Sequence, residues 1–230
     1  MRTTVFANNE YYHIYNRGVD KRKVFLNKND YIRFIHNLYE FNDENPATEF
    51  SRIKHNIKDS TSYIERRPRK KLVDIICFCQ MPNHFHLILV QLVERGITRF
   101  MHKLGTGYTM AFNAKYNRSG SLFQGRFKAI HIENETYLTY LSRYIHLNPA
   151  ELIESNWKKE GIKNWKEVNK FLEEGYRWFS YLDYIGKNNF PSVTNRELLL
   201  SIFGDEKKYK KFIKEWLAKD LTSIEDLILE

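Results

Sequence analysis

Two short apolar segments on either side of a turn constrain the fold of this chain most. The first runs over 72–78 and the second over 84–90, and the residues Gln80, Met81, Pro82 and Asn83 lie between them. Pro followed by Asn is favourable at the centre of a tight turn, whereas Pro is unfavourable inside a central strand. The pattern therefore predicts a β-hairpin of two apolar strands rather than one long strand.

The regions around this hairpin predict further strands and helices. The expected elements are a strand at 11–16, a helix from Asp30 capped by Asn27 or Asn29, a helix from Ile97, a strand at 126–132 and a helix at 135–148 that Pro149 ends. Gly105 and Gly107 weaken the helix from Ile97, where a break is one outcome. The order β-α-β-β-α-β, with one more helix, predicts an α+β fold with a ferredoxin-like or RRM-like antiparallel sheet.

Two segments do not fit this repeating order. Residues 42–71 are polar and end in a basic run, which indicates a long loop or a mobile insertion. Beyond Ala150 the pattern is mostly helical, with helices expected at 165–173, 178–185, 195–203 and 206–218. We therefore expect a domain over 1–150 and a helical C-terminal extension over 151–230. Cys77 and Cys79, two apart on one strand, are expected to be reduced core residues.

The charge of the chain indicates its partners. The 37 Lys and Arg residues outnumber the 28 Asp and Glu residues, and the resulting net charge of +9 favours a polyanion such as nucleic acid or an anionic membrane surface. No apolar run approaches the roughly 20 residues that span a bilayer, and the N-terminus has no apolar signal region. We therefore expect a soluble cytoplasmic protein with no membrane partner.

His84 and His86 are candidate metal ligands. They flank Phe85 in a predicted strand, so both imidazoles leave the same face with Cα atoms roughly 7 Å apart and can converge on one ion. Neutral imidazole suits manganese, iron and zinc, while magnesium prefers oxygen ligands. The alternative is that the pair is incidental, although two imidazoles buried in an apolar strand without partners would cost stability.

The helix expected over 135–148 carries a second pair of candidate residues. Tyr144 and Asn148 are four apart and therefore adjacent on its surface, beside an apolar face. The amide oxygen of Asn148 could complete a metal site, and the phenol of Tyr144 could point at a bound phosphate. The alternative is that Tyr144 packs in the core and Asn148 merely ends the helix.

Three separated runs in one order make the sequence similar to a known family. YYHIYNRGVDKRKVF, then CFCQMPNHFHLILV, then SLFQGRFKAIHIENETYLTYLSRYIHLNPAEL resemble the single-tyrosine HUH transposases, closest to the REP-associated tyrosine transposases. The resemblance covers about residues 10 to 152. A later segment, GYRWFSYLDYIG, is similar to a C-terminal extension of that family, whereas the insertion at 42–71 departs from its pattern.

The resemblance implies a reaction and a set of site residues. His84, His86 and Asn148 would bind a divalent ion, Mg²⁺ or Mn²⁺, and Tyr144 would be the nucleophile. The enzyme would cleave and rejoin single-stranded DNA with hairpins or palindromic repeats through a 5′-phosphotyrosine, as a DNA transposase and endonuclease. Tyr108 and Tyr116 are the rival nucleophiles, but neither has an amide one turn beyond it in the chain, as Tyr144 has. Members of this family act as homodimers or as monomers, and the sequence does not choose between them.

Several residues near the predicted strand at 126–132 are candidate DNA contacts. Arg118, Arg126 and Lys128 could bind phosphates, with solvated surface charge as the alternative for each. Tyr116 and Phe123 could stack on bases, with core packing as the alternative. Two other functions compete with transposition. One is a hairpin nucleic-acid binder without catalysis on an RRM-like sheet, and the other is a metal-dependent nuclease that uses activated water.

Overall fold

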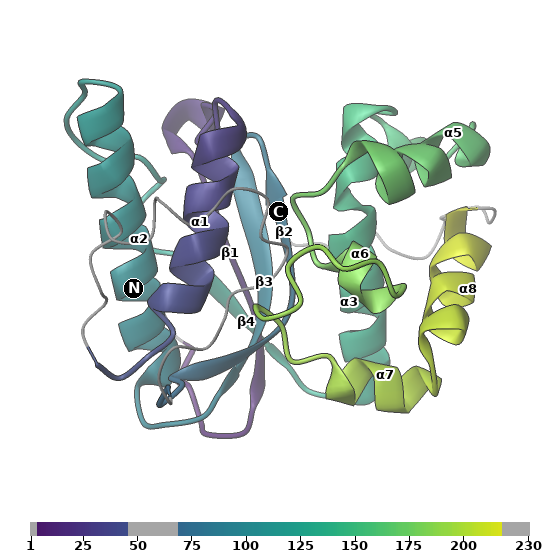
Figure 1. Cartoon of the computed structure of the whole chain (residues 1–230), viewed down its shortest axis with the longest axis horizontal. Coiled ribbons are helices and arrows are strands. Elements are labelled where there is room, and N and C mark those ends of the chain that lie inside the picture. Colours follow the sequence, from purple (N-terminus) through teal and green to yellow (C-terminus); the bar gives the residue numbers. More distant parts are fainter. Residues whose placement is uncertain (1–3, 46–68, 218–230) are drawn as a thin grey trace.

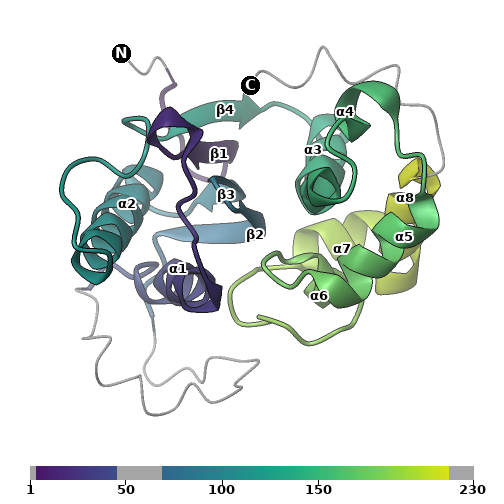
Figure 2. The same cartoon turned by 90° about the horizontal axis from the view of Figure 1, so that it is seen from above.

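A computed structural model describes residues 4–45 and 69–217, so most of the insertion expected at 42–71 lies outside the described residues. Its four antiparallel strands, labelled in Figure 1, have the order β2-β3-β1-β4, which can be followed in Figure 2. The strands are β1 (Tyr11–Arg17), β2 (Val73–Met81), β3 (His84–Gln91) and β4 (Lys128–Ile132). This order is that of a ferredoxin-like sheet, so the predicted α+β fold is confirmed.

The predicted hairpin forms one side of this sheet, with β2 at the edge and β3 next to it. Met81 of β2 pairs with His84 of β3, and Pro82 and Asn83 make the turn between them. Side chains alternate across a strand, so Phe85 and Leu87 face one side while His84 and His86 face the other. The alternation along β3 thus places Phe85 and Leu87 on one face of the sheet and the two imidazoles on the other.

Two helices cover the face of the sheet that carries Phe85. They are α1 (Lys28–Glu40), which Asn27 caps, and α2 (Gly96–Lys115), as Figure 2 shows. α2 continues unbroken through both of its inner glycines. A Cβ atom at Gly107 would lie 2.6 Å from the Phe41 ring, whereas one at Gly105 would meet no atom within 4 Å. Close packing against Phe41 therefore requires Gly107, while Gly105 borders open space.

The opposite face is covered by α3 and by the helical extension (Figure 2). Asn134 caps α3 (Glu135–Leu147) by accepting from the Tyr137 N–H. The elements that follow are η3 (Asn148–Leu152), α4 (Trp157–Glu160), α5 (Trp165–Lys170), η4 (Phe171–Gly175), α6 (Tyr181–Tyr184), α7 (Glu197–Phe203) and α8 (Glu206–Leu217). Trp157, Phe179 and Tyr209 join the same apolar cluster as Ile88 of the sheet. The extension and the sheet thus share one core.

One predicted helix, over 178–185, is wrong in its first half. The backbone of this stretch pairs with the edge strand β2 instead, because Gln80 N–H donates to Trp178 O at 2.9 Å and Ser180 N–H donates to Phe78 O at 3.0 Å. Only Tyr181–Tyr184 is helical. Covering an edge strand protects it from pairing with other chains. The strand predicted from Arg126 likewise begins only at Lys128.

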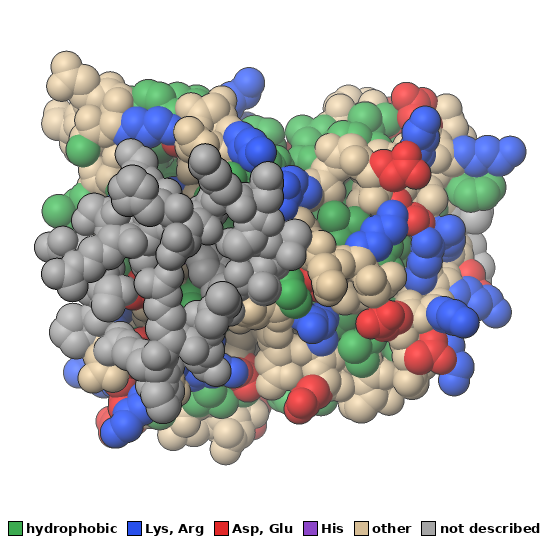
Figure 3. Space-filling view, viewed as in Figure 1, with side chains coloured by type: hydrophobic (Ala, Val, Ile, Leu, Met, Phe, Trp, Pro, Cys, Tyr) green, Lys and Arg blue, Asp and Glu red, His purple; other side chains and the backbone are tan. Residues whose placement is uncertain are grey.

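The remaining expectations concern cysteines, membrane segments and charge. Cys77 and Cys79 are buried and unbridged, and burial raises the pKa of both thiols. No helix within 4–45 or 69–217 has the length and apolar character needed to cross a membrane. Figure 3 shows Lys and Arg side chains intermixed with Asp and Glu over the helical extension. The excess positive charge is therefore not gathered on that side of the molecule in this view.

His146 links α3 to the extension at the centre of their interface. Its Nδ1 lies 2.7 Å from the Tyr209 hydroxyl and its Nε2 lies 2.8 Å from Ser180 Oγ. The ring is fully enclosed, and desolvation lowers its pKa to about 3. His146 is therefore neutral in the folded protein at neutral pH.

This burial predicts a pH-dependent stability. Because the folded pKa lies below that of an unfolded histidine, the unfolded chain binds more protons between about pH 6.5 and about pH 3, and stability falls as pH decreases through that window. In urea unfolding, His146→Gln is expected to lower stability near pH 7 by about 2 kcal/mol and to flatten the pH dependence. His102→Gln, at an exposed position, should leave that dependence as in the wild type. An unchanged pH dependence in His146→Gln would contradict the assignment.

Candidate active site

α3 brings Tyr144 and Asn148 onto the face of the sheet that carries His84 and His86. Asn148 Oδ1 lies 3.3 Å from His84 Nε2, and the Tyr144 ring packs edge-on against His86 with centroids 5.7 Å apart. All four side chains are buried, with 5% of Tyr144 exposed. Since α3 packs on the sheet of its own chain, a single chain brings together the four residues that the sequence singled out.

The donors at this position suit a divalent ion. His84 Nδ1 lies 2.6 Å from Asn83 Oδ1, which leaves the opposite nitrogen of the ring beside Asn148. The Asn148 amide nitrogen is buried and has no hydrogen-bond partner in the described part of the chain, an arrangement that usually costs about 1–3 kcal/mol. Two imidazoles and one amide oxygen form a donor set that accepts manganese and similar ions. The residues present therefore fit a metal ion.

The fit to a metal ion depends on the side-chain amide of Asn148. Within 4–45 and 69–217, no group of three His, Cys, Asp or Glu side chains is placed to hold a metal ion. The third protein donor would have to be the oxygen of Asn148, which the sequence identified by its place one turn beyond Tyr144.

His13 and Tyr15 support the histidine pair from β1. His13 Nε2 lies 2.9 Å from His86 Nδ1, and the Tyr15 ring stacks on His86 with centroids 5.8 Å apart. Hydrogen bonding at Nδ1 fixes the tautomer and the orientation of an imidazole, as in many metal sites. Sequence reasoning missed both residues, because only the pairing of β1 with β3 places Tyr15 opposite His86.

A small basic cavity adjoins His84. Its volume is about 60 Å³, and its lining includes Arg17, Arg126 and Lys128. Arg17 is the pairing partner of His84 across the two strands, and its carbonyl accepts from the Gln124 N–H at 2.9 Å. Three cations beside a candidate metal ligand suit a phosphate group. The sequence indicated Arg126 and Lys128 but missed Arg17, since the predicted strand ended one residue before it.

The other candidate DNA contacts lie apart from this cavity. Arg118 is bonded to Asn113 Oδ1 at 2.8 Å and to Ser121 O at 3.2 Å, near the end of α2. Phe123 is buried with its ring centroid 5.6 Å from that of Phe85, so core packing accounts for it in this conformation. Tyr116 donates its hydroxyl to Asp30 Oδ2 at 2.7 Å.

The rival candidates Tyr108 and Tyr116 lie on the face of the sheet opposite to His84 and His86. Tyr108 is buried within α2 and donates to Val24 O at 2.6 Å, and burial raises the pKa of its phenol. Tyr116 follows α2 and packs on Phe112. α2 covers the face that carries Phe85, whereas His84 and His86 point to the other face. Of the three tyrosines considered, Tyr144 is the one on the histidine face.

The extension adds one cation to this site. Lys158 of α4 places its Nζ 5.2 Å from the centre of the Tyr144 ring and pairs with Glu151 Oε2 at 3.2 Å. The neighbouring Trp157 is buried and anchors this short helix. No sequence pattern links Lys158 to Tyr144, so this contact could be found only from the structure.

Comparisons with known proteins find a similar family and a similar fold. Residues 51–148 match the family model described as IS200-like transposase. A solved structure, that of a REP-associated tyrosine transposase bound to a REP hairpin, is similar in fold with a TM-score of 0.50 and 14% identity, over 85% of this chain and 90% of that chain. No curated protein matches the sequence significantly. The resemblance that the sequence motifs indicated is confirmed.

Proposed function

We propose that this protein cleaves and rejoins single-stranded, hairpin-associated DNA by transesterification at Tyr144. The observation that carries the proposal is the convergence of Tyr144, Asn148, His84 and His86 in one buried site beside a basic cavity. The match to IS200-like transposases supports the same reaction class.

Each step of this reaction has a residue to perform it. Arg17, Arg126 and Lys128 bind the scissile phosphate and orient it. Tyr144 Oη attacks phosphorus, the bond from phosphorus to the 3′ oxygen breaks, the phenol loses its proton and the 3′ oxygen gains one. A divalent ion held by His84, His86 and Asn148 would polarise the phosphate and offset its developing charge. The phosphotyrosine retains the energy of the phosphodiester, so a second 3′-hydroxyl can reverse the reaction without ATP.

The proposed substrate is a single strand that carries a hairpin. The similar solved structure is bound to a REP hairpin, and the positive net charge of this chain suits such a polyanion. The four site residues come from one chain, and we propose that a single subunit carries a complete cleavage site.

The test is to incubate the protein with hairpin oligonucleotides and Mn²⁺ and to look for a denaturant-resistant protein–DNA adduct. Transesterification yields an adduct and a free 3′-hydroxyl. Cleavage without any adduct would favour the metal-dependent nuclease, and binding without cleavage would favour the non-catalytic binder. Either of those outcomes contradicts the proposal.

The contact of Lys158 with Tyr144 gives a further prediction for this reaction. Negative charge on the phenol ring is stabilised by an ammonium over its face, a contact worth about 1–2 kcal/mol when partly desolvated. Lys158→Met is therefore expected to slow adduct formation by roughly tenfold in single-turnover assays, with unchanged DNA affinity. Lys158→Arg should retain most of the rate. The matched control is Lys159→Met, at the exposed neighbouring position, and an equal loss there would contradict a specific role for Lys158.

A further inference from the structure

Tyr15 places a second phenol at the candidate site, beside His86 in the sheet. β1 runs between β3 and β4, so Tyr15 pairs with His86 on one side and with Lys128 on the other. The Tyr15 ring stacks on the His86 ring at 24°, with centroids 5.8 Å apart, and Lys128 Nζ lies 5.5 Å from the centre of the Tyr15 ring. Tyr15 therefore lies between a proposed metal ligand and a cation.

Tyr15 also borders the basic cavity in which the scissile phosphate is proposed to bind. It is the one phenol among the described residues that line this cavity. Tyr144 reaches His86 from α3 with its ring at 83° to the imidazole, whereas Tyr15 reaches it from the neighbouring strand. In an in-line displacement the attacking and leaving oxygens lie on opposite sides of phosphorus. Two phenols that approach from different directions suit these two positions.

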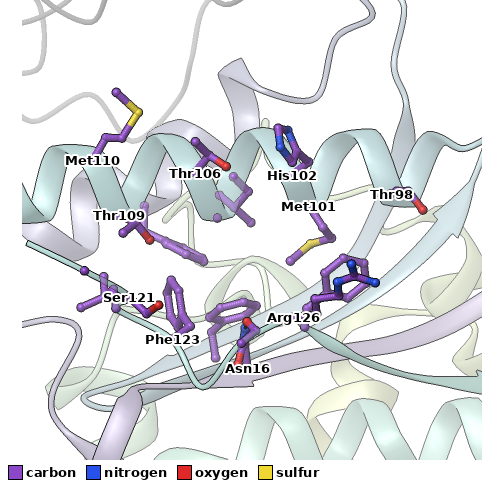
Figure 4. Close-up of a pocket in the computed structure, with 18 residues that line it drawn as sticks. Asn16, Thr98, Met101, His102, Thr106, Thr109, Met110, Ser121, Phe123 and Arg126 are labelled. Atoms are coloured by element: carbon purple, nitrogen blue, oxygen red, sulfur yellow. The ribbon is translucent and has the colours of Figure 1, made fainter. Parts of the chain in front are cut away.

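The 3′ oxygen gains a proton in the proposed reaction, and the cavity lining restricts its source. Two guanidinium groups and two side-chain amides line the cavity, and none of these gives up a proton near neutral pH. Asn16 and Arg126, two of the four, also line a groove beside α2, in which Figure 4 shows them. The imidazole of His84 is assigned to the proposed metal ion. Of the described residues that line the cavity, Tyr15 and Lys128 therefore remain as proton donors.

Tyr15 is the better placed of these two donors. It pairs directly with His86, whereas Lys128 lies one strand further from the histidines and is exposed. The position of the Lys128 ammonium suits it to stabilise negative charge on the Tyr15 ring. The two residues thus divide the roles of proton donor and neighbouring cation.

We propose that Tyr15 is the general acid that protonates the leaving 3′ oxygen. As the bond from phosphorus to that oxygen breaks, its electron pair goes to the oxygen, and the Tyr15 hydroxyl transfers its proton there to form the 3′-hydroxyl and a Tyr15 phenolate. The proton that Tyr144 loses passes to solvent. In rejoining, the Tyr15 phenolate accepts the proton of the attacking 3′-hydroxyl. This role rests on the function proposed above, since it supplies one step of that reaction.

A substrate with sulfur in place of the bridging 3′ oxygen tests this role. A thiol has a pKa of about 8.5, so a leaving thiolate needs little help from a proton, whereas a leaving alkoxide needs it. Adduct formation is measured in single turnovers on the oxygen and sulfur substrates. Tyr15→Phe removes the hydroxyl and keeps the ring that stacks on His86. The matched control is Tyr11→Phe, on the same face of β1 but paired with Val90.

Tyr15→Phe is expected to slow adduct formation from the oxygen substrate by about 10²-fold or more, the usual contribution of a general acid. On the sulfur substrate it should react about as fast as the wild type. Tyr11→Phe should match the wild type on both substrates. Unchanged affinities of Tyr15→Phe for the hairpin and for Mn²⁺ separate the loss of a proton donor from a disturbed His86.

Three outcomes overturn the role of Tyr15. An equal loss on both substrates would make Tyr15 a positioning residue, and an unchanged rate on the oxygen substrate would give it no part in the reaction. Rescue by sulfur in Lys128→Met instead of Tyr15→Phe would make Lys128 the donor. In each of these cases the wild type still forms the adduct, so the proposed function stands. A wild type that forms no adduct from either substrate refutes the proposed function and the role of Tyr15 together.

Discussion

Replacing Tyr144 by phenylalanine is expected to abolish the covalent protein–DNA adduct while hairpin binding persists. The substitution removes one oxygen atom and keeps the ring that packs on His86. Loss of a nucleophile commonly lowers turnover by about 10³-fold or more, which would take the adduct below detection. The measurement is a denaturing gel of protein with labelled hairpin DNA and Mn²⁺, beside a binding titration without metal.

The matched control for this experiment is Tyr116→Phe. The Tyr116 hydroxyl is bonded to Asp30 on the other side of the sheet, so its removal is expected to leave the adduct intact. Thermal unfolding of both variants separates a chemical effect from a folding defect. An adduct that survives in Tyr144→Phe but disappears in Tyr116→Phe would reverse the assignment of the nucleophile.

Local sequence patterns were sufficient to predict the elements that position the site. Pro82 and Asn83 between two apolar runs fixed the hairpin, and the period of two then placed His84 and His86 on one face. The spacing of four between Tyr144 and Asn148 placed them together near the end of α3. These inferences depend on neighbours in the chain, which is why they survive without knowledge of the tertiary structure.

Contacts between distant segments could not be predicted in this way. Arg17 and Tyr15 reach the site only because β1 pairs with β3 in one particular register. The stretch at 178–180 has an acceptable helical pattern, yet its backbone groups bond to β2 because that edge strand offers unpaired partners. Lys158 comes from a short helix whose position depends on the burial of Trp157.

The extension also holds α3, the helix that carries the proposed nucleophile Tyr144. The guanidinium of Arg143, next to Tyr144 in sequence, stacks over the Trp216 ring of α8 at 3.7 Å, and His146 contacts Ser180 and Tyr209. These contacts fix α3 on both sides of Tyr144. Tight positioning of a nucleophile lowers the entropy cost of reaching the transition state. The extension thus contributes to the proposed site even though most of its residues lie outside it.

Removing the proposed divalent ion or its proposed ligands is the second change with a large expected effect. Loss of metal assistance withdraws several kcal/mol of charge stabilisation, so chelation, His84→Ala and His86→Ala are each expected to slow adduct formation by about 10³-fold. Asn148→Ala should weaken Mn²⁺ binding, whereas Asn148→Asp keeps an oxygen donor at the same place and should retain it. His102→Ala, at an exposed position on α2, is the matched control.

Mn²⁺ binding to the free protein, measured by calorimetry or electron paramagnetic resonance, separates a metal site from a merely structural cluster. A structural role for Asn148 predicts that both of its variants lose stability and that neither changes the affinity for Mn²⁺. A ligand role predicts that only the alanine variant loses affinity, because the donor atom and not the fold has been removed. Unchanged Mn²⁺ affinity in His84→Ala together with Asn148→Ala would therefore contradict the metal site, and cleavage would then have to depend on Tyr144 and the basic cavity without it.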